Sequence, residues 1–247
     1  MRSARRHLAR VRKLLLILRT PDYRRGLRFG VAAATEHHRT PLATTYATVV
    51  DVGASHGQFA LVARHRFPGA RLICVEPQPT AARLIERVAG SGVEVITAAA
   101  GARDGEATLH VAAADDSSSL LPIGERQVRE FPGTHEVATL AVPLVALDRV
   151  VVAPRGPVLL KIDVQGGELA VLLGAERLLD AVATVLVECS FAELYAGQPL
   201  ADDVVAFLRD RGFRLAGAFG QVAGRDGAAL QADLVFERDR PASPDRP

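Results

Sequence analysis

Four apolar runs of the chain each end at, or close to, an acidic residue. The acids are Asp51 in TVVDV, Glu76 in RLICVEP, Asp163 in VLLKIDV and Glu188 in ATVLVECS. If the runs are parallel strands, their carboxyl ends meet at one edge of a sheet, which is where such sheets bind ligands. The spacing therefore predicts a cluster of carboxylates that could bind cationic or hydroxyl groups and accept protons.

The first run leads into a turn with two glycines. In VVDVGASHGQF, Val49 to Phe59, the turn contains Gly53, Ser55 and Gly57. Dinucleotide-binding loops have the pattern GxGxxG, whose middle glycine is absent here. Asp51 beside the turn would also repel a pyrophosphate. A ligand with an ammonium, a sulfonium and a ribose fits better, and S-adenosylmethionine has all three.

Glu76 lies 19 residues after Gly57, at the end of the second apolar run. A carboxylate at this position can accept hydrogen bonds from both ribose hydroxyls. Folds that bind NAD share this feature, so Glu76 alone does not separate the two cofactors. Together with the first turn, it indicates a nucleoside-binding α/β domain.

The last two runs supply candidates for the reaction itself. Asp163 could be the general base for a hydroxyl nucleophile, could orient it, or could cap the next helix. Lys161, one of only two lysines, precedes it, and Glu188 is a further acid at the same rim. Three carboxylates could bind a metal, but no spacing requires one, and the seven histidines form no zinc pattern, so we expect no metal.

Two more residues have open roles. Glu168 begins a predicted helix, where a negative charge favours the helix dipole, so a structural role is as reasonable as a functional one. His56 lies inside the first turn and could contact the ligand or point into solvent. The pattern settles neither residue.

The elements that must position these residues alternate between strand and helix. We expect strands over 48–52, 71–77, 93–99, 108–111, 157–164, 183–190, 213–219 and 231–238, and helices over 58–67, 80–88, 168–179 and 202–211. Continuous apolar runs are typical of strands buried on both faces. This predicts a mostly parallel sheet with helices on both sides.

The composition is that of one α/β domain with extensions: 247 residues, 49% of them hydrophobic, and no apolar run of transmembrane length. The apolar stretch 14–18 is short, and no cleavage site follows it, which argues against a secretory signal. Cys74 and Cys189 fall in apolar runs, so we expect buried thiols in a reducing compartment, with a cytoplasmic location.

Charge is distributed unevenly. Residues 1–30 contain ten Lys or Arg and one acid, whereas the rest contains 20 basic and 27 acidic residues, a net charge of −7. The body thus gives no sign of nucleic-acid binding. A basic helix with apolar residues at Leu8, Val11, Leu15 and Leu18 is predicted to end at Pro21. It could contact a membrane surface or a partner, or pack on the domain as an accessory helix.

From about Thr48 to Arg238 the chain resembles the FkbM family of S-adenosylmethionine-dependent methyltransferases. The stretches that carry the resemblance, in matching order and spacing, are VVDVGASHGQF, CVEP (74–77), DSSSLLP (116–122), LLKIDVQGGELAVLLGA (159–175) and VECSFAELYAGQ (187–198). The resemblance implies a class I methyltransferase fold, Rossmann-like, with a seven-stranded sheet of order 3-2-1-4-5-7-6 in which only strand 7 is antiparallel. It also implies O-methylation of a sugar or natural-product hydroxyl.

The resemblance also implies site residues. Those that hold S-adenosylmethionine map to Asp51, Gly53, Ser55, Gly57 and Glu76, and those that line the reaction site map to Ser118, Ser119, Lys161 and Asp163. The family usually has asparagine where this chain has Ser55, and the chain contains no asparagine. Serine keeps a hydroxyl but has less reach, so cofactor affinity could be lower.

The expected organisation is a basic helical extension over 1–47, the methyltransferase domain over 48–238 and a disordered tail over 239–247. The expected partner is a small hydroxylated acceptor. Two alternatives stay open: an NAD-dependent oxidoreductase or epimerase, and a non-catalytic binding module on the same fold. The sequence predicts no oligomeric state.

Overall fold

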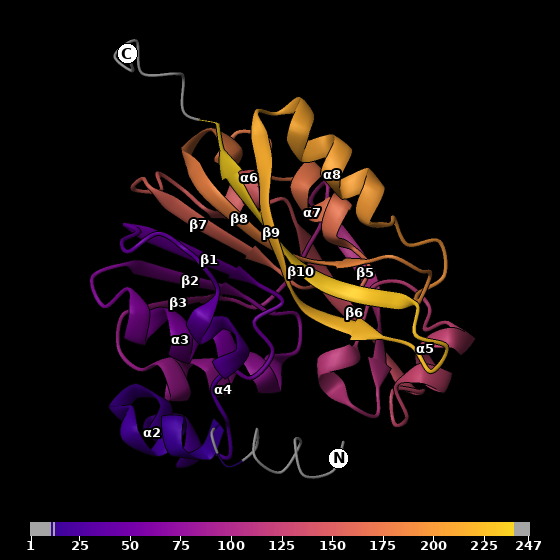
Figure 1. Ribbon diagram of the computed structural model, residues 1–247, viewed down its shortest axis with the longest axis horizontal. Coiled ribbons are helices and arrows are strands. Elements are labelled where there is room, and N and C mark those ends of the chain that lie inside the picture. The colour runs from indigo at the N-terminus through magenta and orange to yellow at the C-terminus, as the bar shows by residue number, and fades with distance from the viewer. Residues whose placement is uncertain (1–10, 12, 240–247) are drawn as a thin grey trace.

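A seven-stranded sheet forms the centre of the computed structural model, which describes residues 11 and 13–239 (Figure 1). Its strands are β1 (Thr48–Val52), β2 (Arg71–Val75), β3 (Val93–Ile96), β7 (Val158–Ile162), β8 (Val182–Ser190), β9 (Phe213–Ala223) and β10 (Ala229–Arg238). Their order is β3-β2-β1-β7-β8-β10-β9. Within this sheet β10 alone runs in the opposite direction to the other strands and pairs antiparallel with β8 and β9. Numbered along the chain, this is the expected order 3-2-1-4-5-7-6, so the predicted fold class is confirmed.

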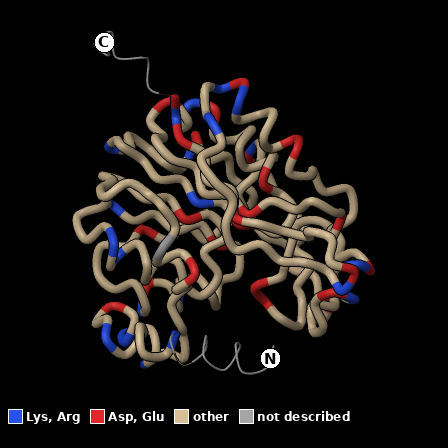
Figure 2. The backbone as a smooth tube through the Cα atoms, in the orientation of Figure 1, with Lys and Arg blue, Asp and Glu red and all other residues tan. Residues whose placement is uncertain are grey.

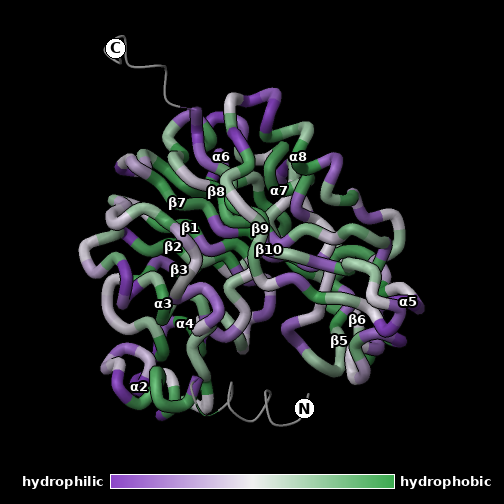
Figure 3. The backbone as a smooth tube through the Cα atoms, viewed as in Figure 1, coloured by the Kyte–Doolittle hydropathy of each residue, from purple (hydrophilic) through white to green (hydrophobic). Residues whose placement is uncertain are grey.

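Helices cover both faces of the sheet. One face packs against α2 (Pro21–Leu27), α3 (Gln58–Arg66) and α4 (Pro79–Ala89), and the other against α6 (Leu147–Val150), α7 (Glu168–Leu173) and α8 (Ala201–Asp210). Strands β1 and β7 are buried along their whole length, as their continuous apolar runs predict. Many charged residues lie toward the periphery, with a small group near the middle of the view (Figure 2), whereas hydrophobic residues dominate the central strands (Figure 3).

A second, three-stranded sheet departs from the prediction. It consists of β4 (Ala99–Ala100), β6 (Glu136–Val145) and β5 (Gly105–Ala112), with η2 (Asp115–Ser117) and α5 (Glu125–Glu130) between β5 and β6. We expected only a short strand over 108–111 in this region, and one strand over 93–99. Most of β6 is exposed and it contains Pro143, a residue that disfavours an inner strand, so the apolar residues of this stretch did not predict it.

The predicted helix over 168–179 is also shorter than expected. α7 ends at Leu173, and a 3₁₀ turn, η3 (Leu178–Ala181), follows. Gly174 meets the second sheet at this point, because a Cβ there would lie 2.0 Å from the carbonyl oxygen of Gly101. The backbones of Gly174 and Gly101 approach closely here, and α7 ends at this point. The apolar pattern of the sequence continues beyond it, which is why the predicted helix is longer.

The region before β1 packs into the domain. Helical residues 13–19, α2 and η1 (Thr35–Arg39) precede the sheet, and Ile17, Tyr23 and Tyr46 are buried in the core that α3 and α4 share. The Tyr46 hydroxyl donates to Thr184 in β8 across 2.8 Å. Residues 1–10 and 12 of the predicted extension and 240–247 of the predicted tail lie outside the described residues.

Two further sequence expectations concern Cys74, Cys189 and the membrane. Both thiols are buried and unpaired, as their apolar surroundings predict. None of the helices in the described part of the chain has the length and apolar character needed to cross a bilayer.

Candidate active site

Two cavities adjoin at the carboxyl ends of β1 and β7. The first has a volume of about 320 Å³ and the second about 350 Å³. Five residues line both: Gly53, Ser55, Asp116, Asp163 and Gln165. The strand ends of a parallel sheet thus open into two adjoining chambers with a common wall.

The first cavity has mainly apolar walls. Ala98 to Ala100 form one side, and Leu109 and Leu144 reach it from the second sheet. Glu76, Asp116 and Asp163 are among the few charged residues that line it. An apolar chamber with a few fixed polar groups is typical of sites for small ligands. The second sheet, which the sequence did not predict, therefore supplies part of the site.

The glycines of the first turn serve the backbone. Gly53 has φ +73°, and a Cβ there would lie 1.8 Å from the carbonyl oxygen of Asp163, so only glycine lets the β1 and β7 loops approach this closely. Gly57, with φ +88°, is the N-cap of α3. Gly53 and Ser55 line both cavities, whereas Gly57 is not among the lining residues.

Glu76 joins the loops that follow β1 and β2. Its Oε2 accepts the backbone N–H of Ser55 and its Oε1 that of Gln78, each across 2.9 Å. The side chain is buried, and burial raises the pKa of Glu76 to about 7. Because each oxygen retains a further lone pair, the carboxyl can still accept a hydrogen bond from a ligand.

Asp51 and Lys161 form an ion pair at the base of the site, where only Lys161 reaches a cavity wall. Oδ1 of Asp51 lies 3.2 Å from Nζ of Lys161, and Asp51 is fully buried and absent from both cavity walls. The cation that faces Asp51 is thus a lysine of the same chain. The Lys161 ammonium also donates to the carbonyl oxygen of Gly53 across 3.2 Å and lies 3.5 Å from Oδ2 of Asp163.

These contacts fix the charge of Lys161. Burial alone would lower the pKa of Lys161, but the carboxylates of Asp51, Asp163 and Glu188 together hold it above its usual value. The ammonium therefore stays protonated and positions its partners rather than accepting a proton.

A glutamine connects the two acids predicted for the reaction. The side-chain nitrogen of Gln165 lies 2.7 Å from Oδ1 of Asp163 and 2.9 Å from Oε2 of Glu188. Gln231 in β10 donates to the same Glu188 oxygen across 3.0 Å. Burial and the neighbouring Asp163 carboxylate raise the pKa of Glu188 well above its usual range. Sequence reasoning did not single out Gln165 or Gln231, since an uncharged amide in a loop and another near the start of a strand carry no pattern.

The two predicted substrate residues, Ser118 and Ser119, line the site and also make contacts within the protein. Ser118 and Ser119 line the first, apolar cavity, Ser117 lines the second, and Asp116 lines both. The Ser118 hydroxyl accepts the backbone N–H of Ala112, and that of Ser119 donates to the carbonyl oxygen of Gln165 across 2.6 Å. Their hydroxyls thus hold the loop in shape.

The two residues with open roles also make contacts within the protein. Nε2 of His56 lies 3.0 Å from Oδ2 of Asp115. This contact joins the first turn to the serine-rich loop that contains residues 116–122. Oε1 of Glu168 accepts the backbone N–H groups of Val164 and Gly166, and burial raises the pKa of Glu168 to about 7. The structure favours the structural reading for Glu168.

The second cavity contains polar groups that the sequence did not reveal. His37 in η1 and Gln127 in α5 line it, and Nδ1 of His37 and Oε1 of Gln127 are buried without a hydrogen-bond partner among the described residues. Nδ1 of His37 lies 3.9 Å from Asp233, too far for a hydrogen bond. Burial, and then the Lys161 ammonium, lower the pKa of His37 to about 4, so the ring is neutral near pH 7.

The second cavity is also rich in carboxyl groups. Its lining includes Glu36, Asp116, Asp163 and Glu188, against the single ammonium of Lys161. Among the described residues, no group of three or more His, Cys, Asp or Glu side chains could hold a metal ion.

Solved structures with similar folds include three methyltransferases, each with low sequence identity and a TM-score below 0.5. Precorrin-6y C5,15-methyltransferase from Geobacter metallireducens has 13% identity and a TM-score of 0.45, over 84% of this chain and 87% of that one. Magnesium protoporphyrin IX methyltransferase from Synechocystis, solved with bound S-adenosylmethionine, has 13% identity and a TM-score of 0.41, over 77% of this chain and 69% of that one. The tRNA methyltransferase TrmK from B. subtilis has 12% identity and a TM-score of 0.44, over 83% of this chain and 64% of that one.

Sequence comparison is more specific. No curated protein matches the chain. The model of the methyltransferase FkbM domain matches residues 51–215, which is more than half of the 247 residues and spans the first turn, both acids of the reaction site and the second sheet. This chain belongs to the FkbM methyltransferase family.

Proposed function

We propose that the protein transfers a methyl group from S-adenosylmethionine to a hydroxyl of a small polar acceptor, such as a sugar or a hydroxylated natural product. The observation that carries the proposal is the position of Asp163, which lines both the apolar and the polar cavity. A carboxylate in the wall that the two cavities share is close to a methyl group that is transferred from a donor in one cavity to an acceptor in the other.

The first cavity suits the donor. Its apolar walls fit a purine, and the Glu76 carboxyl, with its free lone pairs, fits the ribose hydroxyls. Asp116 and Asp163 place negative charge toward the cationic end of the molecule, and no phosphate group has to be accommodated. When bound, S-adenosylmethionine supplies an electrophilic methyl group on a sulfonium centre. Membership of a methyltransferase family favours this donor over NAD.

Asp163 would orient the acceptor hydroxyl and take its proton. Methyl transfer to oxygen requires the hydroxyl to lose its proton as the new bond forms, and a positioned carboxylate can accept it. Lys161 and Gln165 hold the two oxygens of Asp163 in place, at 3.5 Å and 2.7 Å. The protein then contributes mainly alignment of the two reactants, with Asp163 as the proton acceptor.

The second cavity suits an uncharged acceptor rich in hydroxyl groups. Its carboxyl, amide and imidazole groups can hydrogen-bond hydroxyls, and the two unpartnered atoms of His37 and Gln127 are free to do so. The four carboxyl groups of its lining disfavour a polyanion such as RNA. This argues for a small-molecule acceptor over a nucleic acid.

The test compares Asp163→Ala and Asp163→Asn with the parent enzyme. Calorimetry with S-adenosylmethionine and with NAD establishes the cofactor, and labelled cofactor with a panel of sugars and hydroxylated natural products measures transfer. We expect both variants to bind S-adenosylmethionine within a few-fold of the parent and to lose about 10²- to 10⁴-fold in transfer rate. Asp210→Ala, at the exposed end of α8, is the control.

Three outcomes would count against the proposal. Transfer by Asp163→Ala at the parent rate would remove Asp163 from its role. Binding of NAD in place of S-adenosylmethionine would favour the oxidoreductase alternative. Binding of S-adenosylmethionine without transfer to any nucleophile would favour a non-catalytic module.

A further inference from the structure

The helical segment before α2 presents its apolar side to solvent. Val11, Leu14, Leu15 and Leu18 are 46%, 51%, 46% and 47% exposed. Their spacing of three, one and three residues places them on one face of a helix. Leu27 in α2 is a further exposed leucine, at 39%.

The opposite side of the segment fixes this orientation. Ile17 is buried in the core, and Thr20, also buried, donates its hydroxyl to the carbonyl oxygen of Leu16 across 2.9 Å. Nζ of Lys13 lies 3.4 Å from Glu36 in η1. The apolar stripe is therefore not the side by which the helix packs on the domain, although an accessory helix would be expected to bury it.

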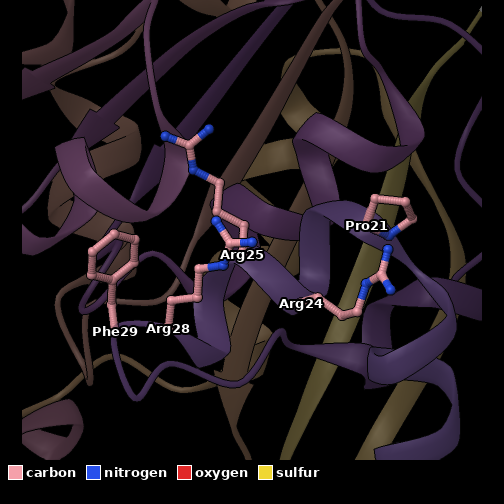
Figure 4. Close-up of a pocket in the computed structure, with 5 residues that line it drawn as sticks. All are labelled: Pro21, Arg24, Arg25, Arg28 and Phe29. Atoms are coloured by element: carbon pink, nitrogen blue, oxygen red, sulfur yellow. The ribbon is translucent and has the colours of Figure 1, made fainter.

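Arginines follow the stripe along the chain, from Arg19 into α2. Arg19 follows Leu18 directly, and Arg24, Arg25 and Arg28 surround a hollow with Pro21 and Phe29 (Figure 4). Within the described residues, the side chains of Arg19, Arg24 and Arg28 form no ion pair or hydrogen bond, whereas that of Arg25 donates to the carbonyl oxygen of Arg87. Figure 2 shows basic positions gathered at the same corner of the molecule.

We propose that this surface, formed by the stripe of Val11, Leu14, Leu15 and Leu18 with Arg19, Arg24 and Arg28, binds an anionic lipid surface. An exposed apolar stripe bordered by arginines is the arrangement with which helices lie in the headgroup region of a bilayer. A second copy of the chain fits less well, since it would bring unpaired arginines against unpaired arginines. The proposal does not depend on the proposed reaction.

Sedimentation with vesicles tests the proposal. The full chain is mixed with vesicles of phosphatidylcholine and phosphatidylglycerol at 3:1, or of phosphatidylcholine alone. We expect binding to the anionic vesicles that weakens with added salt. Leu15→Gln/Leu18→Gln should weaken it about tenfold or more, because two exposed leucines no longer enter the apolar layer. Arg24→Gln/Arg28→Gln should weaken it about twenty-five-fold, at roughly fivefold for each arginine near the surface.

Matched controls use exposed residues elsewhere. Val137→Gln/Val152→Gln removes two apolar side chains that are 57% and 65% exposed, and Arg209→Gln/Arg225→Gln removes two exposed arginines. Both should bind the vesicles like the parent. Equal binding by all four variants, or no binding of the parent to anionic vesicles, would overturn the proposal. So would a dimer in solution that Leu15→Gln/Leu18→Gln dissociates, without vesicle binding by the parent, because a second copy would then be the occupant.

Discussion

The side-chain amide of Gln165 donates to Oδ1 of Asp163 across 2.7 Å. Gln165 has a left-handed backbone, φ +58°, and its amide oxygen lies 2.8 Å from the hydroxyl of Tyr195, so the residue is fixed on three sides. The same amide nitrogen reaches Glu188 in the neighbouring strand. Gln165 thus sets the position of Asp163 and keeps two carboxyl groups from facing each other without a donor between them.

Replacing Gln165 with glutamate tests this positioning role. Gln165→Glu keeps the shape but removes the donor and adds a third carboxyl group beside Asp163 and Glu188. Neighbouring negative charges raise the pKa of a carboxyl group. We therefore expect transfer near pH 7 to fall about tenfold or more, and the acidic limb of the kcat/KM profile to move to higher pH. Gln221→Glu, exposed on β9, is the control. An acidic limb at the parent position would contradict the role.

Lys161→Met should destabilise the protein strongly. The substitution leaves the fully buried Asp51 carboxyl without its cation. Breaking a buried pair from one side costs about 3–5 kcal/mol, which corresponds to a fall in Tm of about 10 °C for a domain of this size. Thermal unfolding measures the change, and Lys13→Met, at the only other lysine, is the control.

A second substitution separates charge from packing in this pair. Lys161→Met/Asp51→Asn removes the isolated charge together with the ammonium, and should recover part of the lost Tm. If the double variant unfolds at the same temperature as Lys161→Met, the loss comes from packing and not from an unpaired Asp51.

Glu168 should make stability depend on pH. Burial raises its pKa to about 7 in the folded protein, against about 4.5 unfolded. Such a group contributes stability that is complete below pH 4.5 and is lost as the pH rises through 7. Glu168→Gln keeps an oxygen that can accept the N–H groups of Val164 and Gly166. Between pH 5 and 8 the free energy of unfolding should fall less in Glu168→Gln than in the parent. The difference between the two falls should be up to about 3 kcal/mol. Parallel denaturant curves at each pH test this, and equal slopes with pH would contradict it.

The elements that could be predicted from the sequence are those with a strong local pattern. The runs at β1, β2, β7 and β8 are mainly apolar and do not alternate, because both faces of these strands are buried. Asp51, Glu76 and Asp163 are recognisable because a charge stands out at the end of such a run. The strand order came from the family resemblance, since periodicity carries no information on which strands are neighbours.

The remaining site residues depend on contacts distant in sequence. Asp233 lies opposite Glu188 only because β10 pairs antiparallel with β8. His37 reaches the second cavity from η1, ahead of the first strand of the sheet. A single polar residue in a short helix or strand does not change the hydrophobic periodicity, so the sequence pattern does not mark it as a site residue. The resemblance named Ser118 and Ser119 as substrate residues, and the structure shows that their hydroxyls are engaged within the loop.

His37 should contribute to acceptor binding at a cost in stability. The neutral ring packs edge-to-face on Phe59, with ring centroids 5.4 Å apart, and its Nδ1 has no partner among the described residues. His37→Phe keeps an aromatic ring and removes both nitrogens. We expect the KM of the acceptor to rise about tenfold, the Kd of S-adenosylmethionine to stay unchanged, and Tm to hold or rise. His135→Gln, exposed before β6, is the control. An unchanged acceptor KM would show that Nδ1 does not contact the acceptor.

Ser55 stands where the family resemblance led us to expect asparagine, and its backbone gives that difference a physical meaning. It has φ +47°, a left-handed conformation that asparagine adopts more readily than serine. Ser55→Asn should therefore raise the free energy of unfolding by about 0.5–1 kcal/mol, and Tm by about 2 °C. Because the Ser55 N–H holds Glu76, a firmer turn should also tighten S-adenosylmethionine binding in calorimetry. Ser55→Ala keeps the unfavourable conformation and should show neither gain. Equal melting temperatures for the asparagine and alanine variants would mean that the left-handed turn carries no measurable cost.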